Sequence, residues 1–146
     1  MARGDIATEI GLWIEDFAED GTGALVIGDL CIIRAGKMKK ITAVTDAGPY
    51  GVVLDTVVKS GTGRLAIRGI IYMDEGNDGA LTKGDIVIPS GTTLGDIKKG
   101  ATTDFSANYV QAQIKELRLM LGMALDAIAK DASGRIMLGP QVGLSD

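Results

Sequence analysis

The chain has 146 residues, a length that suits one domain with a hydrophobic core of its own. Its 15 Lys and Arg against 19 Asp and Glu give a net charge of −4, the wrong sign for neutralising phosphates, so we expect neither a nucleic-acid partner nor a membrane partner. It contains no histidine, which excludes a Ser-His-Asp hydrolase and removes the commonest zinc ligand. We therefore predict no enzyme, no catalytic residues, no metal and no cofactor.

The composition favours many short strands. Hydrophobic residues make up 46% of the chain but aromatic residues only 4%, and 21 glycines supply tight turns. Cys31 is the only cysteine and lies in an apolar run, so we predict a buried thiol and no intrachain disulfide. No run approaches the roughly 20 apolar residues of a membrane span. The first residues lack the apolar core of a signal peptide, so we expect synthesis in the cytoplasm.

Residues 1–23 differ from the rest and are predicted to form an N-terminal arm. Apolar and acidic side chains are mixed along it, and both an amphipathic helix and a strand with Ile10, Leu12 and Ile14 inward fit the pattern. It holds the only tryptophan, Trp13, and one of two phenylalanines, Phe17. Two roles stay open: an arm that docks on a partner, and a strand that packs on its own core.

The remainder, residues 24–146, is predicted to be a β-rich domain made by internal duplication. Residue 51 begins the stretch GVVLDTVVKSGTGRLAI, and 71 residues later the chain reads GMALDAIAKDASGRIML. Upstream, GDLCI from residue 28 recurs as GDIVI from residue 84. The identical pairs in the longer stretch are Gly51 and Gly122, Leu54 and Leu125, Asp55 and Asp126, Lys59 and Lys130, Gly63 and Gly134, and Arg64 and Arg135.

These repeats define two related units, at about residues 24–72 and 80–140, the second with 15 extra residues. In the first unit we predict strands over residues 52–58 and 65–70 that meet at a tip, residues 59–63. In the second, alternation over residues 117–125 predicts a strand, preceded by a short helix or an extended loop at 108–116. The expected fold is mainly all-β, a small barrel or sandwich with at most one or two short helices.

Several motifs invite a chemical interpretation. Asp55 and Asp126 resemble a carboxylate pair for acid–base work, but a hydrogen bond from each to the backbone explains their repetition more simply. The stretch from Asp74 to Asp85 partly matches a calcium loop, with Gly76 in place of one ligand. Lys39 lies in a predicted hairpin, as does the lysine that receives biotin or lipoate, although Lys40 follows it.

The repeated segments, from GDLCII to LGMALDAIAKDASGRIMLGP, resemble the small capsid decoration, or cement, proteins of tailed bacteriophages and related viruses over about residues 25–140. The resemblance implies a β-rich domain, commonly trimeric, that binds the major capsid protein on the outer surface of an icosahedral shell and stabilises it. It brings no catalytic residues. The alternative is a β-barrel binding or adaptor module for a glycan, a small ligand or a covalently attached cofactor. We expect partner contacts from the arm and a hairpin tip, through Ile10, Trp13, Ile14, Phe17, Lys59 and Arg64.

Overall fold

The computed structural model describes residues 2–43, 46, 48–100 and 120–139, and this part of the chain contains strands and no helix. The predicted all-β class is therefore confirmed. The strands are β1 (Ile6–Glu19), β2 (Leu30–Arg34), β3 (Lys37–Lys40), β4 (Tyr50–Val53), β5 (Thr62–Asp74), β6 (Ile86–Pro89), β7 (Ile97–Lys99), β8 (Gly122–Ala124) and β9 (Ser133–Leu138).

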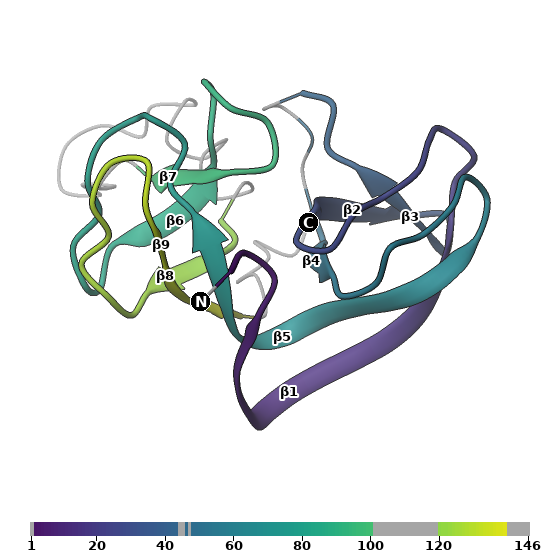
Figure 1. The fold of residues 1–146 in the computed structure, drawn as a ribbon, viewed down its shortest axis with the longest axis horizontal. Helices are drawn as coiled ribbons and strands as arrows, with labels where there is room; N and C mark the ends of the chain where they lie inside the picture. The colour runs from purple at the N-terminus through teal and green to yellow at the C-terminus, as the bar shows by residue number, and fades with distance from the viewer. Residues whose placement is uncertain (1, 44–45, 47, 101–119, 140–146) are drawn as a thin grey trace, which may run out of the picture.

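The strand pairings close two rings that share β5. The sheet runs in the order β1-β3-β2-β4-β5-β9-β8-β6-β7, and β1 also pairs antiparallel with β5, which closes the first ring. In the second ring, a parallel bridge between Glu75 and Ile97 joins the end of β5 to β7. Figure 1 shows the result as two lobes, with the long strands β1 and β5 side by side below them. Ring closure leaves few strand edges exposed, as expected for a duplicated β unit.

The two rings enclose matching cores. Six buried side chains form a cluster in the first ring, and the residues at the equivalent positions of the second ring are also buried. These six pairs are Leu25 and Leu81, Cys31 and Val87, Met38 and Ile97, Val53 and Ala124, Val57 and Ile128, and Leu65 and Ile136. Cys31 is therefore the small buried side chain that the sequence predicts, and burial raises the pKa of its thiol to about 12.

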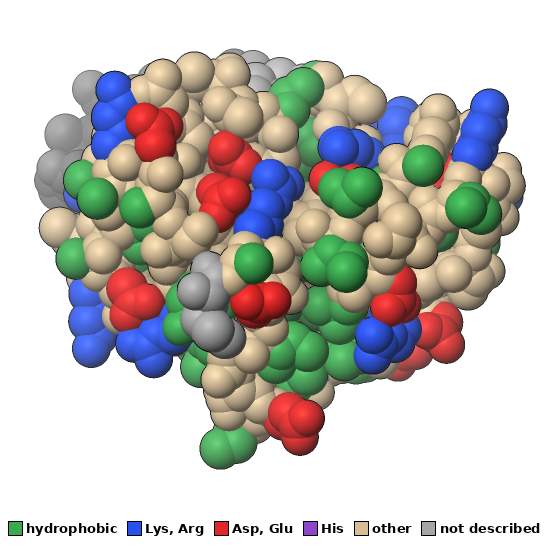
Figure 2. Space-filling view, viewed as in Figure 1, with side chains coloured by type: hydrophobic (Ala, Val, Ile, Leu, Met, Phe, Trp, Pro, Cys, Tyr) green, Lys and Arg blue, Asp and Glu red, His purple; other side chains and the backbone are tan. Residues whose placement is uncertain are grey.

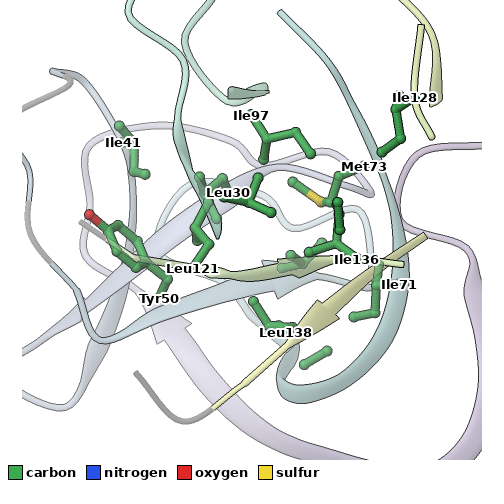
Figure 3. Close-up of a cluster of buried hydrophobic side chains, with 14 of the residues drawn as sticks. Leu30, Ile41, Tyr50, Ile71, Met73, Ile97, Leu121, Ile128, Ile136 and Leu138 are labelled. Atoms are coloured by element: carbon green, nitrogen blue, oxygen red, sulfur yellow. The ribbon is translucent and has the colours of Figure 1, made fainter. Parts of the chain in front are cut away.

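A further apolar cluster joins the two rings into one body. Leu30 and Val52 of the first ring meet Ile71 and Leu121 of the second ring, with Tyr50 at the margin (Figure 3). The hydroxyl of Tyr50 donates a hydrogen bond to the carbonyl of Asp46 at 2.6 Å. The cavity among these side chains measures about 10 Å³, roughly the space that one water needs. The described interior is thus packed, with no room for a ligand at this junction.

Several predicted boundaries are wrong for tertiary reasons. The strand expected over residues 52–58 ends at Val53, because the chain then crosses the mouth of the ring, where Val57 exchanges two main-chain hydrogen bonds with Leu25. The strand expected over residues 65–70 extends over Thr62–Asp74, since it serves both rings. Of the strand expected over residues 117–125, only Gly122–Ala124 is a strand in the described part. The segment 108–116 lies outside the described residues.

Residues 6–19 form a strand, which is one of the two alternatives that the sequence allows. Leu12 and Ile14 pack against the core as predicted, but Ile10 is 84% exposed. The register of β1 against β5 shifts between Thr8 and Trp13, so the intervening residues bulge out of the ladder and turn Ile10 to the surface. The expectation that Ile10 points inward is therefore wrong.

Two buried glutamates hold equivalent loops in the two rings. Glu75 accepts hydrogen bonds from the backbone N–H groups of Asn77, Asp78, Gly79 and Asp131 at 2.7–3.1 Å. Glu19 does the same for Gly21, Thr22, Gly23 and Ser60 at 2.7–3.0 Å. Both side chains are only 2% exposed. Each carboxylate therefore connects the turn that follows a long strand with the tip of a hairpin far along the chain.

The substitution Glu75→Gln tests this role. It replaces one acceptor oxygen with an NH₂ group that faces two N–H donors, so we expect the free energy of unfolding to fall by about 2–4 kcal/mol. Glu19→Gln should act in the same direction, whereas Glu9→Gln, on the exposed bulge of β1, should leave stability nearly unchanged. Urea denaturation measures all three. Equal stabilities for the Glu75 and Glu9 variants would contradict the assigned role.

Candidate interaction surface

The four arm residues predicted to make contacts divide into two exposed and two packed side chains. Ile10 is 84% exposed and Trp13 is 52% exposed. Ile14 and Phe17 are partly buried, the first against the cluster that joins the rings and the second against the core of the first ring. Of these four residues, Ile10 and Trp13 therefore offer large apolar areas to a partner, and Ile14 and Phe17 fix β1 to the body.

Ile10 lines an open groove at the junction of three strands. Ile70 of β5 and Met137 and Leu138 of β9 add to its apolar lining, Arg68 contributes a charge, and the groove encloses about 270 Å³. Trp13 pairs with Arg68 in the β1–β5 ladder and so adjoins the groove. We call Ile10, Trp13, Ile70 and Met137 the β1 surface. Figure 2 shows one face of the molecule, on which hydrophobic side chains are interspersed with charges of both signs.

The polar end of Trp13 is satisfied within β1. Its indole N–H donates a hydrogen bond to Glu15 Oε1 at 2.9 Å, which leaves the ring as an exposed apolar plate with a fixed edge. An aromatic side chain with few rotamers loses little entropy on binding, and tryptophan is enriched among the residues that dominate binding energy. The β1 surface thus combines an aromatic anchor with three aliphatic neighbours, Ile10, Ile70 and Met137.

The hairpin tip carries less free charge than the sequence suggests. Arg64 Nη2 lies 2.8 Å from Asp55 Oδ1, so its guanidinium is already paired, whereas Lys59 is exposed at the tip. Arg64 lies opposite Asp16 in the ladder and Gly63 lies opposite Phe17. The tip is therefore at the C-terminal end of β1, and the structure does not bring it together with Ile10.

The repeated Asp and Arg form the same ion pair in both rings. Asp55 Oδ2 accepts the backbone N–H of Arg64 at 2.8 Å, and Asp126 Oδ2 accepts that of Arg135 at 2.9 Å, which confirms the predicted bonds to the backbone. Arg135 Nη2 lies 2.6 Å from Asp126 Oδ1. Hydrogen bonds from the guanidinium and the backbone N–H of Arg135 lower the pKa of Asp126 to about 2. Arg64 lowers the pKa of Asp55 in the same way.

Two of the repeated glycines, Gly63 and Gly134, are explained by close packing rather than by a functional site. A Cβ on Gly63 would lie 2.3 Å from Val57 Cγ2, and a Cβ on Gly134 would lie 2.3 Å from Ile128 Cγ1. The side chain that closes each ring thus rests on a glycine, and any larger residue there displaces it. Nothing in the described structure explains the identity of Lys59 and Lys130.

Sequence reasoning missed the buried glutamates, although a signal was present. Residues 19–25 read EDGTGAL and residues 75–81 read EGNDGAL, with the same 56-residue separation as the GDLCI repeat. Extending that repeat upstream would have paired Glu19 with Glu75. The segment that resembles a calcium loop uses its carboxylates internally: Glu75 binds backbone N–H groups, and Asp78 accepts hydrogen bonds from Ser90 and Thr92. The described residues contain no group of three or more potential metal ligands.

Lys39 lies inside β3, opposite Ile32 of β2, and is partly buried. The turn of this hairpin is formed by Ala35 and Gly36, which both have positive φ. A lysine that an enzyme must modify is presented at such a turn, so the geometry does not favour Lys39 as an attachment site.

The ion pairs predict a dependence of stability on acid. The pKa of folded Asp126 lies below its ordinary value of 3.8, so the pair stabilises the fold above that pH and loses its effect as the pH falls towards about 2. Asp126→Asn should therefore show a shallower loss of unfolding free energy between about pH 4 and pH 2 than the unchanged protein. Urea titrations at several pH values measure the two slopes. Identical slopes would show that the pair does not couple to folding.

In the described residues, no helix is long and apolar enough to cross a membrane. No family model matches the chain, and no curated protein matches it.

Proposed function

We propose that this chain is a structural protein that binds the outer surface of an icosahedral viral shell and stabilises it as a decoration protein. The observation that carries the proposal is the β1 surface, where Ile10 and Trp13 are exposed on an otherwise tightly packed body. Exposed apolar groups that cluster on a small rigid protein are typical of protein–protein interfaces. The resemblance of the repeated segments to capsid cement proteins supplies the class of partner.

The packing supports a role in which the protein acts as a rigid clamp. Within the described residues, every buried side-chain nitrogen and oxygen has a hydrogen-bond partner. The junction between the rings holds a cavity of only about 10 Å³. A body of this kind deforms little under load, which is what a shell under internal pressure requires of its clamps. The same features give no support to the alternative of a small-ligand module.

The predicted contact residues then take different roles. Trp13 is the anchor of the contact and Ile10 adds apolar area beside it. Ile14 and Phe17 keep β1 attached to the rings, so their substitution should change stability before it changes binding. Arg64 shapes the hairpin tip through Asp55, and exposed Lys59 can meet an acidic patch on the capsid protein. The net charge of −4 opposes aggregation of the free protein before assembly.

Binding to shells tests the proposal. The purified protein is added to expanded shells that lack it, and we expect the temperature at which the shells disrupt to rise. Trp13→Ala should weaken binding by about tenfold or more, the loss expected for an aromatic anchor. Leu94→Ser, which changes an equally exposed aliphatic residue in the loop between β6 and β7, is the matched control. Failure to bind any shell would refute the function, and equal loss in both variants would refute the β1 surface.

Oligomerisation gives a second, independent test. A decoration protein acts through many weak symmetric contacts, so we expect a trimer of the 15.2 kDa chain, either free in solution or on the shell. Native mass spectrometry of the free protein should give a trimer, or else quantitative gel analysis of decorated shells should give three copies at each binding site. A strictly monomeric stoichiometry at both steps would contradict the trimer.

A further inference from the structure

The two rings repeat their outer ladder as well as their cores. Pairing of β1 with β5 in the first ring has the same register as pairing of β5 with β9 in the second. Asp16 lies opposite Arg64, and Tyr72 lies opposite Arg135. Asp16 and Tyr72 are 56 residues apart and Arg64 and Arg135 are 71 residues apart, which are the two separations of the sequence repeats. Asp16 is therefore the counterpart of Tyr72.

In the second ring the outer edge of this ladder is occupied. The backbone N–H of Tyr72 donates to the carbonyl of Asp5 at 3.0 Å, and the backbone N–H of Gly4 donates to the carbonyl of Tyr72 at 2.8 Å. Ile6 continues the pairing opposite Ile71. Residues 4–8 thus form an added antiparallel strand on the edge of β5, and the structure itself shows that this position accepts one.

In the described part of the chain, the equivalent edge in the first ring has no strand beside it. Arg64 directs both main-chain groups away from β1, because its N–H donates to Asp55 Oδ2 at 2.8 Å and its carbonyl accepts from Leu54 N–H at 3.0 Å. In an antiparallel ladder the residue opposite then directs its own N–H and carbonyl to the far edge. For Asp16 that edge has no strand beside it in the described part of the chain, since β3 pairs only with Ala18 and Glu19.

The charge of β1 indicates what fits there. Two carboxylates of β1, Glu15 and Asp16, are exposed beside this edge, and as successive residues of a strand they lie on opposite faces of the sheet. Glu19 is buried and holds the turn that follows it, so it does not face a partner. A second copy of β1 laid antiparallel and centred on Asp16 would place this carboxylate opposite its own copy, which destabilises a strand pair. A lysine or arginine opposite Asp16 on an incoming strand would instead face a carboxylate. Lys37 of β3 lies beside Ala18, at the end of the open edge. A basic residue at the start of the incoming strand would lie next to Lys37, and repulsion between the like charges disfavours it there.

We propose that the open edge of β1, centred on Asp16, binds an extended basic segment of a partner protein as an additional antiparallel strand. Backbone hydrogen bonds supply the affinity in this mode, and the side chains at alternate positions supply the specificity. The site is a different surface from the one formed by Ile10, Trp13, Ile70 and Met137, and it does not depend on the proposed function.

Amide hydrogen exchange, measured by NMR, tests the open edge first. In the free protein the Asp16 amide should exchange much faster than the amide of its counterpart Tyr72, whose N–H is hydrogen-bonded. Equal protection of the two amides would overturn the proposal, because it would mean that the edge is already filled.

A peptide then tests the occupant. The probe is a short capped peptide that begins with glutamate and continues as alternating valine and lysine. At about tenfold excess over its Kd it should slow exchange of the Asp16 amide about tenfold. A peptide of the same sequence, N-methylated at the alternate amides that would face β1, keeps the charge but cannot donate these hydrogen bonds, so it should not slow exchange. Absence of binding, or equal binding of both peptides, would overturn the proposal.

The variant Asp16→Pro isolates the edge itself. Proline is tolerated on an edge strand where its missing N–H faces outward, so this variant should fold and lose peptide binding. Asp16→Asn keeps the N–H and should retain main-chain pairing, with a weaker affinity from the lost charge. If Asp16→Pro folds, as judged by circular dichroism, and still binds the peptide like the unchanged protein, the proposal is wrong. If Asp16→Pro does not fold, the N-methylated peptide decides the question. The proposal is wrong if this peptide binds the unsubstituted protein as tightly as the unmodified peptide does.

Discussion

The fold depends on a buried carboxylate used twice, as Glu19 and Glu75. Each is an acceptor of four backbone N–H groups and lies where a long strand ends and the next loop begins. Burial by itself raises the pKa of Glu19. Hydrogen bonds from the backbone N–H groups of Ser60, Gly23 and Gly21 nevertheless hold this pKa well below its ordinary value. The charge is thus stabilised by oriented dipoles rather than by a cation. Without it, both the turn and the hairpin tip would present unpaired donors to the core.

The shared strand β5 makes one body of two rings. Its first half completes the first ring and its second half begins the other, so neither ring can open without disturbing its neighbour. The packing is consequently asymmetric. Leu30 is fully buried because the outer face of the first ring packs on the second, whereas its counterpart Ile86 is 39% exposed. The repeated residues build the same ring twice, and the differences between the copies decide which surfaces stay available.

Both proposed contact regions include residues of β1. The equivalent of β1 in the second ring is the second half of β5. The exposed side chains of Ile10 and Trp13 offer apolar area, and the main chain at Asp16 offers hydrogen bonds. These are chemically distinct modes of binding on one element. A strand that pairs with the body along one edge, and along part of the other has no neighbour among the described residues, can hold a partner without any rearrangement of the core.

The sequence by itself determined the strand-rich class, the duplication and the local role of Asp55 and Asp126. These follow from short-range rules: alternation, turn residues, and a carboxylate that finds a nearby N–H. Only the tertiary structure decided that β4 stops at Val53, that Ile10 turns outward and that the guanidinium of Arg64 forms an ion pair with Asp55. Each of these depends on segments that are apart in the chain. The open edge at Asp16 belongs to the same class. Whether a strand has a free side is a property of its neighbours in space, and no local pattern encodes it.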